Sequence, residues 1–373
     1  MLEEFEISND EIIPICVMAT MSSGKSTFLN AILGDEVLPE RNEACTARAL
    51  AVLNIPGEAE PKAYIKKNDG KKYRVNLHDP NAVVKINSDE SVEAVLIVKD
   101  ISTITNTSKS MVFFDTPGVN NSGDIRHAKR TEEIIDRLHG GVIVYLLNAT
   151  QLAANDDELL LRQVIDHVKR NPELKIIFVL NKIDMLDEEK ESISRIIEDA
   201  VEYIKDHGLE EIRIFPLSAL SAKTFRMKLN GKKMTKVEKR HLEQAYPEYE
   251  DSGKSMLQYV STYNTYAEDY DIAGRRVSEY ALRRAIENTG IVEIERQIEK
   301  YAMEAEQTAL KNYKSISSYT ELEGVYSPKR RVKNYESYGG KIQWICKKCG
   351  QINGTNQMCL HCGNSNLRLR KIN

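Results

Sequence analysis

The sequence predicts an α/β fold with a mostly parallel central sheet, a helical insertion and a small cysteine-rich C-terminal unit. Three observations lead to this prediction. Apolar runs of strand length alternate with amphipathic helical segments through the first half of the chain. A charged and mostly helical stretch follows at 219–288, and four of the six cysteines lie close together near the C-terminus. Alternating strands and helices of these lengths form parallel sheets with right-handed crossovers.

The alternation can be followed element by element. It begins with a strand at 11–19, a helix that opens after the segment SSGKS and stops at Gly34, and a strand at 47–55. A polar hairpin is expected at 62–66 and 72–75, whereas 77–108 shows only weak periodicity. The later elements are strands at 111–114, 142–147, 175–180 and 212–215, and helices at 124–138, 157–169, 188–206 and 292–313. Solid rather than alternating apolar runs indicate strands covered on both faces.

Composition divides the chain into an acidic body and a basic tail. The net charge is −4, but residues 314–373 hold 11 Lys and Arg against 3 Asp and Glu. We therefore expect a main domain at 1–313 with its insertion at 219–288, a basic linker at 314–340 and a small domain at 341–367. No apolar run has the roughly 20 residues of a membrane span, and the acidic N-terminus is unlike a signal peptide. These features predict a cytoplasmic protein.

The first motif that carries chemistry is Ala19-Thr-Met-Ser-Ser-Gly-Lys-Ser26, where a strand turns into a helix. The N–H groups at a helix N-terminus bind phosphate oxygens, and this context identifies a phosphate-binding loop. Lys25 is expected to reach the β- and γ-phosphates, and the Ser26 hydroxyl to bind Mg²⁺. The predicted phosphate contacts come from Ser23, Gly24, Lys25, Ser26 and Thr27.

Two further motifs concern the γ-phosphate and Mg²⁺. Asp115-Thr-Pro-Gly118 follows the strand at 111–114, so that Asp115 can hold the Mg²⁺ water shell and the Gly118 N–H can sense the γ-phosphate. Thr46 lies in a loop that can close over Mg²⁺ and the γ-phosphate. The alternative for Thr46 is an ordinary loop threonine, since its register beside Cys45 is uncertain.

The last two motifs concern the base. Asn181-Lys182-Ile-Asp184 ends another strand, and a carboxylate there can accept hydrogen bonds from N1–H and the N2 amine of guanine. Ser218-Ala219-Leu220 follows the strand at 212–215, where its backbone can contact the guanine O6. Five motifs in this order, four of them at strand ends, predict a P-loop domain that binds GTP and GDP.

The motifs together resemble the dynamin-like large GTPases, especially their bacterial branch. The residues that carry the resemblance are MSSGKSTFLNAILGDEVLPE, ACTARA, VFFDTPGVNN, VYLLNATQL with Asn155-Asp156-Asp157, and VLNKID, over roughly 11–220 together with the helix at 290–313. The resemblance implies Mg²⁺-dependent GTP hydrolysis that is stimulated when two GTPase domains meet face to face as a homodimer. The 60 residues after Tyr313 are not expected to form a stalk, so membrane remodelling is not expected to carry over.

By the same resemblance, Lys25, Ser22 and Thr46 are the catalytic candidates. Ser22 would help to hold a monovalent cation, K⁺ or Na⁺. Met21 stands where eukaryotic dynamins have a water-orienting glutamine, and Val119 replaces the catalytic glutamine of small GTPases. Intrinsic turnover is therefore expected to be slow unless a partner completes the site.

The C-terminal cysteines have the spacing of a zinc ribbon. Two CxxC pairs, each followed by glycine, can place four thiolates around one Zn²⁺. The ligands would be Cys346, Cys349, Cys359 and Cys362. With Trp344 and Asn353 the segment also resembles RanBP2-type zinc fingers. Gly354, Thr355 and Asn356 stand where that family has its RNA-contacting residues, which argues against RNA binding in that manner.

Three functions remain open at this stage. The first is a GTPase that dimerises through its GTPase domain, and the second is a GTP-regulated adaptor with little turnover that recruits a protein or nucleic-acid partner through the zinc ribbon. The third is a nucleic-acid-binding protein led by the ribbon. The basic stretch 329–333 can contact nucleic acid or an anionic membrane, or it can be a solvated linker.

Overall fold

The structure is a computed structural model of the 373-residue chain. It describes residues 5, 7, 11–20, 22–38, 49–58, 60–76, 82, 86, 89–116, 138, 140–152, 155–187, 192–250, 255–256, 269–272, 274–307, 344–345 and 352–353. The chain divides into two compact units, Met1–Pro328 and Lys329–Asn373. The domain boundaries expected from the sequence remain predictions.

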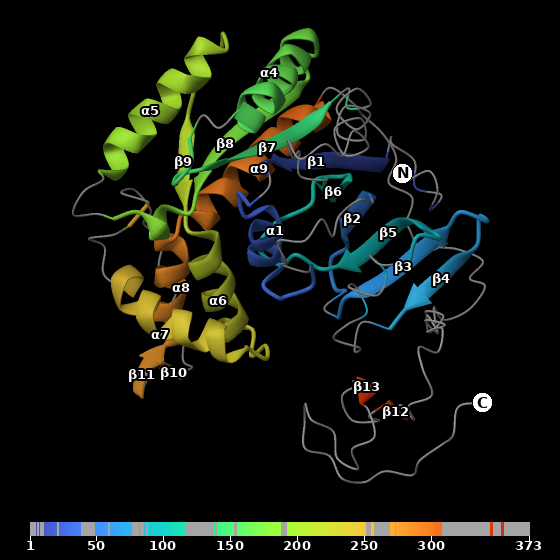
Figure 1. Ribbon diagram of the computed structural model, residues 1–373. Helices are drawn as coiled ribbons and strands as arrows, with labels where there is room; N and C mark the ends of the chain where they lie inside the picture. The colour runs from blue at the N-terminus through green and yellow to red at the C-terminus, as the bar shows by residue number, and fades with distance from the viewer. Residues whose placement is uncertain are drawn as a thin grey trace. The chain divides into compact units, whose positions relative to one another are not determined.

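The first unit is built on a nine-stranded sheet within these described residues (Figure 1). Its strands are β1 Ile12–Ala19, β2 Ala49–Asn54, β3 Lys62–Lys67, β4 Lys72–Val75, β5 Val92–Lys99, β6 Ser110–Asp115, β7 Gly141–Asn148, β8 Leu174–Asn181 and β9 Ile214–Leu217. They lie in the order β4-β3-β5-β2-β6-β1-β7-β8-β9. The run β6-β1-β7-β8-β9 is parallel throughout, whereas β2 is antiparallel to β6. The expected mostly parallel sheet is confirmed.

The helices cover both faces of the parallel half of the sheet. They are α1 Lys25–Leu33, α4 Asn155–Arg170, α5 Ile193–Asp206, α6 Ala219–Leu229, α7 Lys236–Glu250, α8 Glu279–Asn288 and α9 Ile291–Gln307, with a short 3₁₀ helix η3 at Ile183–Met185. Side chains of β1 alternate between two cores: Ile15 and Val17 pack with α1, α6 and α9, and Cys16 and Met18 pack with α4 and α5. Strands buried on both faces explain the solid apolar runs in the sequence.

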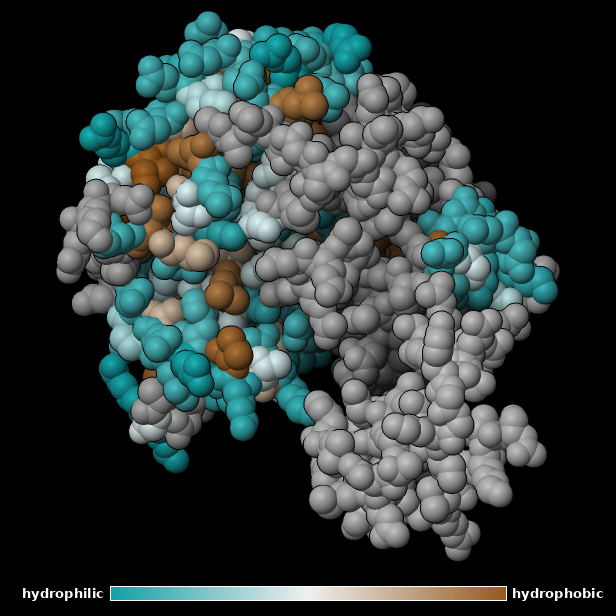
Figure 2. All heavy atoms as spheres, in the orientation of Figure 1, coloured by the Kyte–Doolittle hydropathy of each residue, from teal (hydrophilic) through white to brown (hydrophobic). Residues whose placement is uncertain are grey.

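The surface has the polarity that this packing predicts. Figure 2 shows hydrophilic residues over the outer faces of α4 and α5 and over the β3–β4 hairpin. None of the helices in the described part of the chain has both the length and the apolarity of a membrane span.

Several predicted elements differ from the structure. Strand β5 lies within the segment that showed only weak periodicity, and it pairs with β2 and β3 inside the sheet. The helix expected at 188–206 is observed from Ile193, and the strand expected at 212–215 is observed at Ile214–Leu217. The insertion resolves into α6, α7, α8 and a hairpin of β10 Asp269–Ile272 and β11 Arg275–Ser278. The helix expected at 124–138 lies outside the described residues apart from Leu138.

The chain that leaves α1 is fixed by one buried side chain. The helix ends at Gly34, whose positive φ of 62° matches the predicted stop. Asn30 is fully buried, and its amide donates to the Leu38 carbonyl at 2.8 Å while its Oδ1 accepts from the N–H groups of Val37 and Leu38 at 3.0 and 2.8 Å. This clamp holds the start of the segment that leads to Thr46.

The second unit contains a short antiparallel ladder among its described residues. Strand β12 Trp344–Ile345 pairs with β13 Ile352–Asn353, with Trp344 opposite Asn353. The four cysteines of the expected zinc ribbon lie outside the described residues.

Candidate nucleotide-binding site

The phosphate-binding loop joins β1 to α1 through two residues with positive φ. Ser22 has φ 65° and Gly24, which precedes the helix, has φ 88°. A turn bond from the Ser23 N–H to the Thr20 carbonyl at 3.3 Å closes the loop. No side chain caps the N-terminus of α1 and its first turn carries no acidic residue. The positive end of this helix is therefore suited to an anion.

Lys25 and Asp115 form a buried ion pair behind this loop. The Lys25 ammonium donates to Asp115 Oδ1 at 2.5 Å, and the two side chains are 8% and 1% exposed. The neighbouring Cys16 is fully buried, and this burial raises the pKa of its thiol. The parallel pairing of β1 with β6 places these two sequence motifs at one edge of the sheet. The motif predicted to bind phosphate thus contacts the one predicted to hold Mg²⁺.

Asn181, at the end of β8, joins the phosphate loop to the segment 218–220 that is predicted to contact the base. We call this segment the base loop. Its Nδ2 donates to the Ser23 carbonyl at 2.8 Å, and its Oδ1 accepts from the Ala219 N–H at 3.1 Å. The side chain is 2% exposed. Three loops that are more than thirty residues apart in the sequence are therefore bound together by one amide.

Gly24 has both a conformational and a steric reason to be glycine. Its φ of 88° is costly for other residues, and a Cβ added there would lie 2.4 Å from Asn181 Nδ2. The loop and the asparagine therefore fit together only while residue 24 lacks a side chain.

The base-contacting candidates surround this asparagine. Lys182 has φ 67°, and the half-buried Asp184 lies in η3 directly after β8. Ser218 is fully buried and caps α6, accepting a hydrogen bond from the Ser221 N–H at 3.3 Å. The cap and the bond from Ala219 to Asn181 fix the backbone that is expected to face guanine.

The remaining predicted residues are only partly placed. Ser26 and Thr27 are half-buried in the first turn of α1, and Ser22 is exposed. Thr116, which follows Asp115, donates to the Val17 carbonyl at 2.8 Å and ties this motif to β1. Thr46, Gly118, Met21 and Val119 lie outside the described residues, as do the four predicted zinc ligands.

Two residues near the base loop were missed by sequence reasoning. His241 and Tyr249, both on α7, lie beside Ser218 and Ser221. Their spacing of two helical turns marks one face of a helix. Such a stripe predicts a buried face but does not identify the loop against which it packs.

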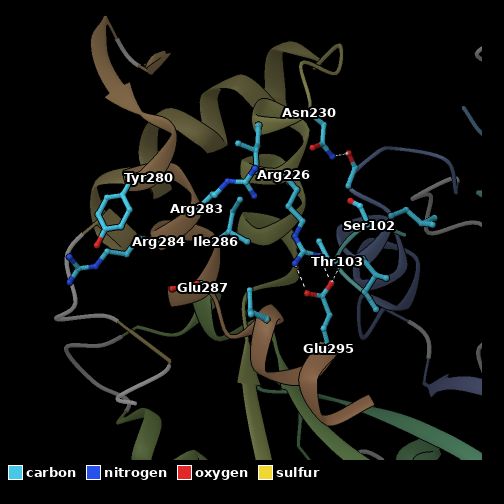
Figure 3. A pocket seen from close by; sticks show the side chains of 15 residues that line it. Ser102, Thr103, Arg226, Asn230, Tyr280, Arg283, Arg284, Ile286, Glu287 and Glu295 are labelled. Carbon is cyan, nitrogen blue, oxygen red and sulfur yellow. Dashed lines mark hydrogen bonds and ion pairs between the residues drawn. The ribbon is translucent and has the colours of Figure 1, made fainter. Parts of the chain in front are cut away.

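A separate cavity of about 270 Å³ lies at the other end of α1 (Figure 3). One of the three arginines among its described lining residues, Arg226, is already paired. It donates to both oxygens of Glu295 at 2.5 and 2.6 Å and to the Ala31 carbonyl at 2.9 Å. Asn230 donates to the Gly34 carbonyl at 3.0 Å. Among the described residues, no predicted nucleotide contact lines this cavity. Arg226 and Asn230 hold the C-terminal end of α1 beside this cavity, which is distinct from the candidate nucleotide site.

Comparisons with known proteins agree with this geometry. Residues 15–183 match the model of the dynamin family. A segment of 56 residues is 45% identical to "Clamp-binding protein CrfC" of Escherichia coli strain K12, over 15% of this chain and 7% of that protein. The "Probable transmembrane GTPase FZO-like, chloroplastic" of Arabidopsis thaliana is 25% identical over 57% of this chain and 20% of that protein. "Bacterial dynamin-like protein" of Nostoc punctiforme is 24% identical over 57% of this chain and 33% of that protein.

The chain thus spans one third or less of the length of these curated relatives. The residues that match the dynamin-family model include the phosphate loop, the Asp115 motif and Asn181. Residues 15–183 of the first unit are therefore similar to the dynamin family, as the motifs predict.

Replacing Gly24 tests the fit between the phosphate loop and Asn181. Gly24→Ala is expected to destabilise the fold by about 2 kcal/mol or more and to weaken GDP binding, because strain at positive φ adds to the clash. Gly57→Ala is the matched control, since Gly57 has φ 85° but nothing within 4 Å of an added Cβ. Gly57→Ala should lower the free energy of unfolding by only about 1 kcal/mol. Chemical denaturation and GDP titration measure both effects, and equal losses in the two variants would contradict the predicted fit.

Proposed function

We propose that the protein binds GTP and hydrolyses it to GDP and phosphate with Mg²⁺, and that its activity rises when two GTPase domains meet. The observation that carries this proposal is the Asn181 bridge, which brings the phosphate loop and the base loop to one edge of the sheet. Asp184 follows at the same edge and supplies a carboxylate of the kind that distinguishes guanine from adenine. The match to the dynamin family supports the same reaction.

Lys25 has the central role in phosphate binding. Its ammonium is held by Asp115, and nucleotide binding would replace this contact with β- and γ-phosphate oxygens. The α1 N-terminus contributes backbone N–H groups and the positive end of its dipole. These groups bind and orient the triphosphate and stabilise the negative charge that develops during transfer.

The residues present fit a magnesium ion. The Ser26 hydroxyl and the Asp115 carboxylate are hard oxygen donors, which Mg²⁺ prefers, and Thr46 is the third proposed ligand. When bound, Mg²⁺ would neutralise charge on the β- and γ-phosphates. Asp115 is held in place for this role by its strand and by the neighbouring Lys25.

The attacking water has no dedicated glutamine in the sequence, because Met21 and Val119 occupy the corresponding positions. We infer that Thr46, backbone groups and a second GTPase domain position the water. Ser22 is exposed within the phosphate loop, and this supports a role at such an interface, where K⁺ or Na⁺ would add positive charge.

GTP hydrolysis per molecule should therefore rise with protein concentration. Lys25→Ala should lower the rate about 100-fold or more, because an oriented charge at the transferring phosphate is lost. Lys239→Ala, on the exposed face of α7, serves as the control for removing a lysine. Phosphate release would be measured with GTP and ATP, in K⁺ and in Na⁺. A flat, near-zero rate despite GTP binding would exclude self-activation and would favour the GTP-regulated adaptor.

We further propose that the C-terminal unit is a zinc ribbon that binds a protein partner. The support is the spacing of the four cysteines, a thiolate donor set that suits Zn²⁺. The paired strands β12 and β13 flank the first two cysteines in the sequence. The metal would supply folding energy that so short a segment cannot obtain from an apolar core.

Removal of zinc should unfold the C-terminal unit and leave the nucleotide site intact. The purified chain should contain about one zinc ion, and Cys346→Ser should abolish zinc binding because three thiolates hold the ion poorly. Cys16→Ala is the control for losing a cysteine outside the proposed ligand set, since Cys16 is buried in β1 and alanine adds no buried polar group there. Metal analysis and GDP titration provide the two measurements. A full zinc content in Cys346→Ser would contradict the proposed ligand set.

A further inference from the structure

Helix α7 presents one continuous face to α6. The buried or half-buried residues Glu238, His241, Leu242, Ala245 and Tyr249 recur at spacings of three and four, which places them along one side of the helix. Figure 1 shows α7 lying against α6, and α6 begins at the base loop. The face of α7 is therefore directed towards the part of the site expected to read guanine.

The start of α7 is fixed by a reciprocal cap and a buried ion pair. The Thr235 N–H donates to Glu238 Oε2 at 2.7 Å, and the Glu238 N–H donates to Thr235 Oγ1 at 3.2 Å. The other Glu238 oxygen accepts from the Lys223 ammonium of α6 at 2.9 Å. These bonds set the position of α7 along α6.

His241 ends a chain of side-chain hydrogen bonds that begins at the base loop. The Ser218 hydroxyl donates to Ser221 Oγ at 2.8 Å, and Ser221 Oγ lies 3.1 Å from His241 Nε2. Because Ser221 Oγ already accepts from Ser218, its own hydrogen can be donated to Nε2. We assign the acceptor role to Nε2 on this basis, which places the proton of a neutral imidazole on Nδ1.

This chain of hydrogen bonds reaches the residues that are expected to position the base. Ser218 caps α6, and the next residue, Ala219, donates its N–H to Asn181. Tyr249 approaches the same pair of serines, with its hydroxyl interacting with Ser218 and Ser221. Two side chains of α7 therefore hold the first turn of α6 and the loop before it.

We propose that His241 is a positioning residue for guanine, which fixes the backbone of Ser218 and Ala219 through Ser221. This inference rests on the proposed function, because it assumes that the base lies between this loop and Asp184. It assigns to the helical insertion a role in base recognition. His241 acts through Ser221 and does not itself contact the nucleotide.

The surroundings of His241 make this contact dependent on pH. Burial lowers the pKa of His241, and the charges of Asp184 and Glu248 oppose this effect while Lys223 adds to it. The imidazole is therefore neutral near pH 7 and gains its proton at a lower pH than an ordinary histidine does. Protonation would turn Nε2 into a donor and place a positive charge near Asp184, the carboxylate needed for guanine. Guanine-nucleotide affinity should consequently fall as the pH is lowered.

The charged groups around the imidazole come from three elements. Asp184 belongs to η3, Lys223 to α6 and Glu248 to α7. Burial raises the pKa of Tyr249, the remaining titratable neighbour, so that its hydroxyl stays neutral at these pH values. Lys223 is already paired with Glu238. Asp184 is thus the group on the nucleotide side to which a protonated imidazole would be attracted.

Three variants of the full-length chain test the proposal. His241→Leu removes the acceptor, whereas His241→Gln keeps a hydrogen-bonding oxygen but cannot gain a proton. Arg240→Gln is the matched control, because the neighbouring Arg240 is exposed. Affinities would be measured for Mg²⁺ with GDP and for Mg²⁺ with pyrophosphate, which contacts only the phosphate loop. Thermal unfolding establishes that each variant is folded.

His241→Leu is expected to weaken GDP binding about fivefold to tenfold and to leave pyrophosphate binding unchanged, the effect of one lost hydrogen bond at the base. His241→Gln should bind GDP within about twofold of the original protein at about pH 8. Towards about pH 5.5 its GDP affinity should fall less than that of the original protein, because only protonation of the GDP terminal phosphate then contributes. Arg240→Gln should behave as the original protein does.

The proposal would be overturned if His241→Leu bound GDP normally, or if it lost GDP and pyrophosphate binding equally. It would also be overturned if the GDP affinity of His241→Gln fell with pH as steeply as that of the original protein. Failure of the proposed function looks different, because the folded original protein would then bind neither GDP nor pyrophosphate.

Discussion

The candidate site depends on one side-chain amide, which lies at the end of β8 and joins the phosphate loop to the base loop. Asn181 holds the Ser23 carbonyl on one side and the Ala219 N–H on the other, within a buried environment where an unpaired polar group is costly. The parallel run of β1, β6, β8 and β9 brings these loops to one edge of the sheet, and Asn181 then fixes their separation. Gly24 has to remain without a side chain for this contact to form. The distance between the loops proposed to bind the phosphates and the base is thereby set by packing.

The helical insertion extends this arrangement on the side of the base. Its helices do not simply cover apolar surface, since the Lys223–Glu238 pair and the chain from Ser218 to His241 are polar and specific in direction. At the other end of α1, Arg226 and Glu295 join the P-loop helix to α9. The insertion and the last helix therefore hold the proposed nucleotide-binding elements at both ends, and these hydrogen bonds add to the apolar packing between the helices.

Much of the fold was predictable because motif and position agreed. The DTPG and NKID segments follow apolar strands, and the carboxyl ends of parallel strands meet at one edge of a sheet. The structure confirms that the two strands, β6 and β8, belong to one parallel run. Strand β5 was missed because a short apolar run within a polar segment has no period that distinguishes strand from helix. The antiparallel placement of β2, and the contact between His241 and Ser221, depend on tertiary packing between segments that carry no local signal for each other. The roles of Thr46, Gly118 and the four C-terminal cysteines stay predictions.

The most direct test of guanine recognition is to compare GDP and xanthosine diphosphate binding by the original protein and by Asp184→Asn. Xanthine has a carbonyl oxygen where guanine has its amine, so that an asparagine amide can donate where the aspartate accepted. We expect the original protein to prefer GDP and the variant to prefer xanthosine diphosphate, with each preference about 100-fold or more. An unchanged order of affinities in Asp184→Asn, or equal binding of GDP and ADP by the original protein, would contradict the assignment of this site to guanine.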